Sequence, residues 1–227
     1  MTLTELFSSR KMVLIVSLPA NDPVIARGAA TAGADALKAH LNVTHPASGT
    51  RFGSFDEERG NLEKILSCVP IPVGVMPGAE NPASVEDMKR LSGMGISFFD
   101  IYDHHMPEGY WELEGLEKMI AVGAGSGADA VERLEKRGAR HLEASIIPVE
   151  KYGERLSVGD LNAYADVARR FGGTVTVPTQ KRIEPGELKM LHMAGVRGIM
   201  IGAVVTGADS LSVRESVKRY RKALDAL

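Results

Sequence analysis

The chain has 227 residues, of which 44% are hydrophobic, 25% are charged and 5% are aromatic. This composition is typical of a globular protein and excludes disordered, collagen-like and coiled-coil chains. The 27 basic and 29 acidic residues give a formal charge of −2. A nearly neutral chain has no net attraction to nucleic acid or to an anionic membrane, although a local basic site for a small anion is still allowed.

Cysteine content and hydropathy limit the cellular context. Cys68 is the only cysteine, which excludes an internal disulfide and a cysteine-based metal cluster. The apolar run 12–18 is too short to span a bilayer, and residues 1–11 lack the apolar core of a signal peptide. We therefore expect a soluble, cytoplasmic protein with neither nucleic acid nor membrane as a partner.

Short runs typical of buried strands alternate with helix-length segments from one end of the chain to the other. Several of these segments end at a glycine shortly before the next run, as at Gly33, Gly95 and Gly195, which is a common helix C-terminus. Eight strand-helix units of roughly 28 residues favour a single (β/α)8 TIM barrel over residues 1–227, because an open doubly wound sheet would leave two free edges. The predicted strands are 12–18, 36–43, 71–76, 97–103, 119–124, 141–147, 174–178 and 198–202.

Polar side chains on the inward face of the second strand are the strongest signal of a site. Leu37, Ala39 and Leu41 alternate with three polar residues, so the alternation predicts that Lys38, His40 and Asn42 point into the barrel. Buried polar groups are costly without partners. Lys38 is explained either by an anionic substrate or proton transfer, or by an ion pair that fills the barrel.

Carboxylates on two further strands can reach the same rim. The alternation of the fourth strand turns either Asp100 or Asp103 inward, and that of the sixth turns Glu143 inward. A lysine between two carboxylates suits proton abstraction next to a carbonyl, with one carboxyl group as base and another as acid. Lys38 and His40 would then stabilise the developing oxyanion. Alternatively, Glu143 is only the buried counter-ion of Lys38.

The histidines raise the question of a metal. His104 and His105 are adjacent, so an extended chain would point them in opposite directions. We expect no metal site, and interpret the histidines as substrate contacts or exposed loop residues.

The ends of the last two strands are candidates for phosphate binding. Gly202 and Ala203 follow the eighth strand and offer backbone amides, and Lys181 follows the seventh. The alternative is a tight turn beside solvated charges. Ser17, Asn42 and Asp103 are further candidate substrate contacts, and long loops at 43–54, 104–112 and 148–157 are candidate lids or specificity elements.

The segments 14–17, 27–34 and 194–206 resemble the ribulose-phosphate-binding barrel group, and within it N-acetylmannosamine-6-phosphate 2-epimerase. The resemblance implies a phosphorylated substrate, with the amides of Gly202 and Ala203 on the phosphate. The epimerase family has its catalytic lysine at the end of the third strand and its catalytic glutamate near the end of the seventh. This chain has Met76 and Thr179-Gln180 there, so its chemistry must come from other strands.

Three functions follow from these residues. The first is an isomerase, epimerase or lyase acting on a small phosphorylated metabolite by acid–base chemistry. The second is a lyase or synthase that forms a Schiff base through Lys38, and the third is a barrel that binds a phosphometabolite without turnover. We expect no flavin or nicotinamide cofactor, because no G-x-G-x-x-G lies at a strand-helix junction. A homodimer is expected only by analogy with other barrels.

Overall fold

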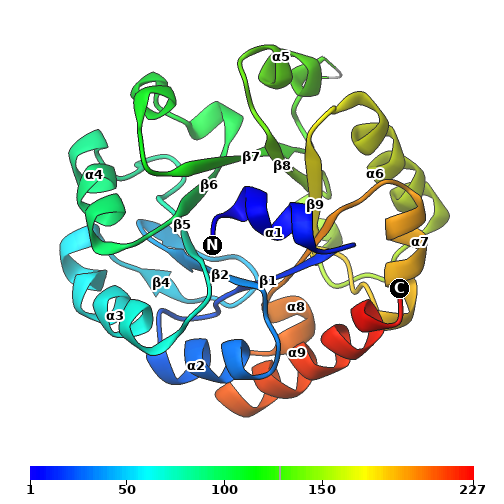
Figure 1. Ribbon diagram of the computed structural model, residues 1–227. Coiled ribbons are helices and arrows are strands. Elements are labelled where there is room, and N and C mark those ends of the chain that lie inside the picture. The colour runs from blue at the N-terminus through cyan, green and yellow to red at the C-terminus, as the bar shows by residue number, and fades with distance from the viewer. Residues whose placement is uncertain (128) are drawn as a thin grey trace.

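The computed structural model describes residues 1–127 and 129–227, in which eight parallel strands close into a barrel (Figure 1). Each predicted strand has a counterpart, and the prediction of a TIM barrel is confirmed. Around the barrel the order is β1, β2, β5, β6, β7, β8, β9, β10 and back to β1. Their bounds are Val13–Ser17, Ala36–His40, Val73–Met76, Phe98–Tyr102, Glu117–Gly123, His141–Ser145, Thr174–Pro178 and Gly198–Ile201.

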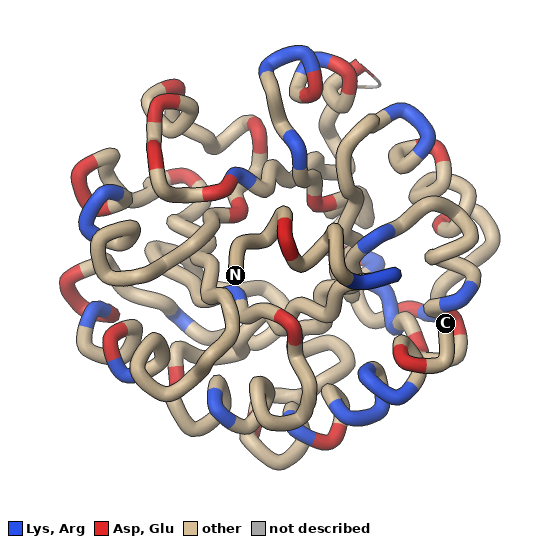
Figure 2. Tube along the Cα trace, in the orientation of Figure 1, with Lys and Arg blue, Asp and Glu red and all other residues tan. Residues whose placement is uncertain are grey.

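Helices form the outer ring, and several of them begin at a residue whose side chain caps the helix. Asp22 caps α2, whereas Ser54 and Ser157 form capping boxes at the starts of α3 and α6. Lys and Arg as well as Asp and Glu occur around this ring, in keeping with the small net charge (Figure 2). The main helices are α2 (Pro23–Thr31), α3 (Phe55–Cys68), α4 (Val85–Met94), α5 (Ala130–Lys136), α6 (Val158–Arg170), α7 (Leu188–Met193) and α9 (Ser210–Asp225).

A short helix, α1 (Leu3–Ser9), crosses the end of the barrel at which the strands begin (Figure 1). Its Leu3, Leu6 and Phe7 are buried in a cluster with inward residues of the strands, including Phe98. The carboxylate of Glu117 accepts hydrogen bonds from the backbone of Leu3 and from Thr4. Burial opposes its charge, but the interaction with His141, followed by those with Thr4 and Leu3, lowers its pKa to about 2. This end of the barrel is therefore filled by side chains.

Additional short elements lie at the opposite end, where the strands finish. The predicted loop 43–54 contains a hairpin of β3 (Val43–Thr44) and β4 (Arg51–Phe52). The loops after β6 and β8 contain 3₁₀ turns at Asp103–His105, Glu108–Glu112 and Val149–Lys151. The four-residue helix α8 (Ala203–Thr206) follows β10. Among the described residues, no helix is long and apolar enough to cross a membrane.

Candidate active site

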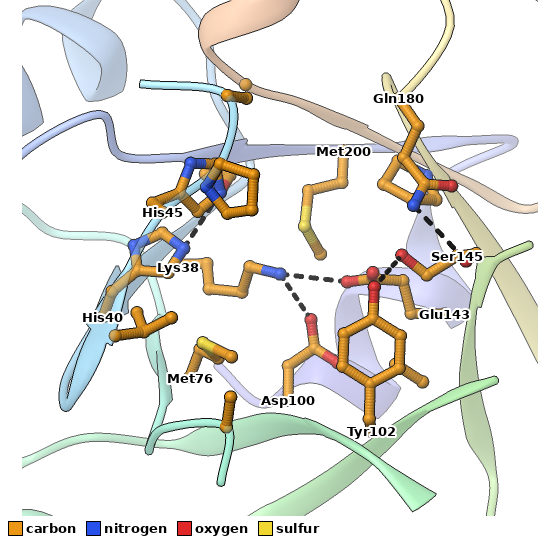
Figure 3. A pocket seen from close by; sticks show the side chains of 18 of the residues that line it. Lys38, His40, His45, Met76, Asp100, Tyr102, Glu143, Ser145, Gln180 and Met200 are labelled. Carbon is orange, nitrogen blue, oxygen red and sulfur yellow. Dashed lines mark hydrogen bonds and ion pairs between the residues drawn. The ribbon is translucent and has the colours of Figure 1, made fainter. Parts of the chain in front are cut away.

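Three buried ionisable side chains meet inside the barrel (Figure 3). Lys38 on β2 donates hydrogen bonds from Nζ to Asp100 Oδ2 on β6, at 2.7 Å, and to Glu143 Oε2 on β8, at 2.9 Å. Their exposed fractions are 8%, 2% and 4%, respectively. All three point inward because each occupies an alternate position on its strand. The open choice between Asp100 and Asp103 is thereby settled in favour of Asp100.

Burial and mutual charge decide which of the three groups is ionised. Burial alone would lower the pKa of Lys38, but Asp100 and Glu143 outweigh it and raise that pKa above its ordinary value. Burial and the nearby Glu143 raise the pKa of Asp100 well above its ordinary value. Burial also opposes the charge on Glu143, but the Lys38 ammonium outweighs it and lowers the pKa. Of the two carboxyl groups, Asp100 is therefore the one that holds its proton to the higher pH, whereas Glu143 and Lys38 favour their charged forms.

This cluster forms the floor of a cavity of about 350 Å³ that lies at the ends of the strands where they finish. The structure brings seven of the predicted site residues to this cavity: Ser17, Lys38, His40, Asp100, Glu143, Gly202 and Ala203. The hairpin of β3 and β4 contributes Val43 to its wall, and the turn after β6 contributes His104. The site thus combines a charged floor with walls drawn from loops.

A chain of hydroxyl groups runs from the floor along one wall. Ser145 hydrogen-bonds to Glu143, and its Oγ lies 2.8 Å from the Tyr102 hydroxyl. Gln180 Nε2 donates to the Tyr152 hydroxyl at 2.6 Å and to the Ser145 carbonyl at 3.3 Å. Sequence reasoning did not select Tyr102, Tyr152 or Gln180 as site residues. Of these three, only Tyr102 could have been selected from its own segment, because it lies two residues after Asp100 on the same strand and so faces the same side.

His40 lies at the opposite wall and is 1% exposed. Its Nε2 lies 3.2 Å from Ser17 Oγ, whereas its Nδ1 is buried without a hydrogen-bond partner among the described residues. Burial, together with the neighbouring His45 and Lys38, lowers the pKa of His40 well below its ordinary value. Burial likewise lowers the pKa of His45 to about 4. Both imidazoles are therefore neutral at pH 7.

The loop after β10 presents backbone amides at the rim. The Gly202 amide donates to Thr179 Oγ1 at 3.0 Å, which ties this loop to the end of β9. Ala203 and Val204 both line the cavity and stand at the first turn of α8, where amides lack helical partners. Within the described part of the chain, neither amide has a recorded hydrogen-bond acceptor.

Three predicted residues lie away from the cavity. The prediction that Asn42 continues the inward face of the second strand is wrong, because β2 ends at His40 and Asn42 adopts a left-handed φ of 49°. Its side chain donates to the Pro77 carbonyl instead. Asp103 turns back to cap the His104 amide at 2.9 Å.

Lys181 is likewise not among the residues that line the cavity. Its ammonium is 2.6 Å from Glu154 Oε2 and 3.7 Å from Asp160 Oδ2, and the bond with Glu154 raises its pKa. The cation predicted for an anion at this rim is thus already paired. In the described residues, no group of three or more His, Cys, Asp or Glu side chains is placed to bind a metal.

Comparisons with known proteins identify the fold. No protein-family model matches the chain, and no curated protein sequence matches it. Among solved structures, tryptophan synthase from Mycobacterium tuberculosis is similar with a TM-score of 0.76 and 17% identity, covering 97% of this chain and 96% of that one.

Two further solved structures share the whole barrel. KGPDC from Streptococcus mutans has a TM-score of 0.69 and 14% identity, over 96% of this chain and 99% of that one. Phosphoribosyl anthranilate isomerase from Thermus thermophilus has a TM-score of 0.67 and 14% identity, over 95% and 99%. At these identities the likeness establishes the TIM-barrel fold alone. The resemblance to N-acetylmannosamine-6-phosphate 2-epimerase stays a prediction.

Proposed function

We propose that this protein is a cofactor-independent acid–base enzyme, an isomerase, epimerase or lyase, that acts on a small phosphorylated metabolite. The observation that carries the proposal is the cluster of Lys38, Asp100 and Glu143 at the cavity floor. Two carboxyl groups whose pKa values are driven in opposite directions supply an acid and a base at the same pH.

The cluster suits proton transfer next to a carbonyl group. Glu143 takes a proton from the carbon, and the electrons of the C–H bond move into an enolate. The Lys38 ammonium stabilises the oxygen on which the negative charge develops, and Asp100 gives its proton to a carbon of the enolate, so that Glu143 ends protonated and Asp100 ends ionised. A general acid or base contributes about 10²- to 10⁴-fold to rate. In the reverse direction, the two carboxyl groups exchange these roles.

The protonation of Lys38 favours this chemistry over a Schiff base. An amine must be neutral to attack a carbonyl, but Asp100 and Glu143 hold the pKa of Lys38 above its ordinary value. Imine formation would therefore require the ammonium to lose its proton against two adjacent acidic groups. The same contacts favour a role for Lys38 as a hydrogen-bond donor and counter-charge.

Support for a phosphate group comes from the rim. Ala203 and Val204 offer two amides without partners beside the cavity, and backbone amides at a helix start attract anions. Some proteins of similar structure carry a phosphorylated compound in their names, such as thiamine phosphate pyrophosphorylase from Pyrococcus furiosus. The resemblance to the epimerase family is in accord with the same substrate class.

A thermal-shift screen with matched pairs of ligands tests the phosphate. Each pair consists of a phosphorylated compound and its phosphate-free counterpart, such as dihydroxyacetone phosphate and dihydroxyacetone. We expect only the phosphorylated members to raise the melting temperature. Ala203→Asp, which puts a negative charge at the rim, should abolish this rise.

Lys181→Met is the matched control, because the Lys181 side chain lies outside the cavity and should leave the response unchanged. Equal stabilisation by both members of each pair would contradict the proposal. Stabilisation that survives Ala203→Asp but is lost in Lys181→Met would move the phosphate away from this rim. Binding of phosphorylated ligands without turnover would favour a phosphometabolite-binding protein.

A further inference from the structure

We infer that the body of the substrate, apart from its phosphate, is apolar and planar, such as an aromatic or heteroaromatic ring, and carries few hydroxyl groups. The inference rests on the proposed function for the phosphate end and adds the chemical class of the remainder. Most polar groups of the cavity are paired with one another, and apolar side chains form much of the rest of its wall.

Most polar side chains of the cavity already bind one another. Ser145 pairs with Tyr102 at 2.8 Å, and Ser17 pairs with His40 at 3.2 Å. Beside Ser145, the Tyr152 hydroxyl accepts from Gln180 at 2.6 Å. The oxygen of the Gln180 amide accepts from the Ile147 backbone at 3.1 Å. Each pair uses part of the hydrogen-bonding capacity of its groups, so fewer donors and acceptors are left for the hydroxyl groups of a sugar, and hydroxyl groups left without partners are unfavourable.

Apolar side chains occupy the space beside the charged floor. Met76 on β5 and Met200 on β10 lie on either side of the Lys38 side chain (Figure 3). Ala121 and Pro178 complete the apolar wall. Thioether side chains adapt to the faces and edges of rings and make favourable sulfur–aromatic contacts. A flat apolar body fits between such walls.

Aromatic and imidazole rings surround the mouth of the cavity. The rings of His104 and His105 lie 4.3 Å apart, and that of Tyr102 lies 5.3 Å from His104. On the opposite side, His45 lies 4.9 Å from His40. These rings contact one another directly, and an aromatic ligand at the mouth can pack against the outer faces and edges of the group.

Few polar groups at the floor of the cavity are free to bind a ligand. Lys38 has a third N–H beyond the two that bind the carboxyl groups. Asp100 Oδ1 and His40 Nδ1 lack hydrogen-bond partners among the described residues, but both atoms are fully buried. The floor can therefore serve one polar substituent at the reacting end of the ligand, whereas Thr44 and His105, whose side chains form no hydrogen bond within the described part of the chain, lie among the other residues that line the cavity.

Isothermal titration calorimetry with phenyl phosphate, ribose 5-phosphate, phenol and inorganic phosphate tests the inference. We expect phenyl phosphate to bind at least tenfold more tightly than ribose 5-phosphate, although both carry the same anionic group. Tighter binding of ribose 5-phosphate would overturn the inference and leave the proposed function intact. Binding of phenol as tight as that of phenyl phosphate, with no binding of ribose 5-phosphate, would support the inference and contradict the phosphate. No binding of either aryl compound would overturn the inference.

Variants of the apolar wall locate the effect. Met200→Gln places an amide on the wall and should weaken phenyl phosphate about tenfold while changing ribose 5-phosphate less than twofold. Met76→Gln is a second variant should the first fail to fold. Met193→Gln is the matched control, because Met193 is 77% exposed on α7 and lies outside the cavity. Equal weakening of both ligands by the wall variants would contradict the inference.

Discussion

Asp100→Asn changes the way in which stability depends on pH. In the unfolded chain Asp100 has an ordinary pKa near 3.8 and is ionised above pH 6. In the folded protein, burial and Glu143 raise this pKa well above that value, so the carboxyl group keeps its proton to a higher pH than in the unfolded chain. Folding therefore takes up one proton in the pH window between the unfolded and the folded pKa. The stability associated with this proton is present at low pH and is lost as the pH rises through the folded pKa.

The size of the effect follows from proton linkage. One proton bound only by the folded state lowers the free energy of unfolding by about 1.4 kcal/mol for each pH unit. This loss continues for as long as the pH stays below the folded pKa of Asp100. His40 and His45 are neutral in the folded protein but partly protonated in the unfolded chain near pH 7, so they add a slope of opposite sign there. This slope is the same in the unchanged chain and in an Asp100 variant, and it cancels when the two are compared.

Asparagine keeps an oxygen to accept from Lys38 and has no proton to lose. We therefore expect Asp100→Asn to remove the slope of about 1.4 kcal/mol per pH unit, relative to the unchanged chain. The measurement is urea unfolding at pH 7, 8 and 9, followed by circular dichroism. Asp166→Asn is the matched control, because Asp166 is an exposed acid on α6 and should keep the original slope. Equal slopes for the unchanged chain and Asp100→Asn would refute the assignment of the proton to this cluster.

Three further substitutions test other parts of the structure. Lys38→Met leaves Glu143 buried without its cation, and should lower the free energy of unfolding at pH 7 by about 3 to 5 kcal/mol in urea titrations. A loss below 1 kcal/mol would contradict a buried ion pair. Tyr102→Phe removes the hydroxyl that bonds to Ser145, and should lower the free energy of unfolding by only about 0.5 to 1.5 kcal/mol in the same titrations. Once a substrate is known, kcat should fall with KM unchanged. A change in KM alone would point to a role in binding. Glu117→Gln removes a carboxylate of lowered pKa, which stabilises the fold above pH 4.5 and loses this effect as the pH falls toward 2. Amide hydrogen exchange of residues 3–9 at pH 6 should therefore become faster. Unchanged exchange would show that α1 does not depend on this carboxylate.

The barrel and its charged floor follow from local sequence patterns. Strands alternate their side chains with a period of two, so the inward positions of Lys38 and Glu143 could be predicted from their own segments, whereas the fourth strand allowed either Asp100 or Asp103. Because parallel strands of a barrel finish at the same end, inward parity is enough to bring these residues together. Their protonation states could not be predicted, since each depends on the other two groups.

The failures occur where the chain leaves a strand. The period of two no longer applies at Asn42, where a left-handed residue redirects the backbone. Lys181 is held by Glu154 and Asp160, which are about 20 to 30 residues away in sequence, and no local pattern encodes that contact. By contrast, α1 had a legible signal, because Thr2 and Glu5 form a capping box.

Deuterium incorporation in heavy water tests most directly whether the cavity is an acid–base active site. Small phosphorylated aldehydes and ketones, including aryl examples, are incubated with the protein in D₂O and followed by proton NMR. We expect at least one compound to exchange a C–H proton next to its carbonyl group, and we expect Glu143→Gln, which removes the base, to abolish this exchange. Exchange that persists in Glu143→Gln, or its absence with every phosphorylated compound that binds, would contradict an acid–base role for this cluster.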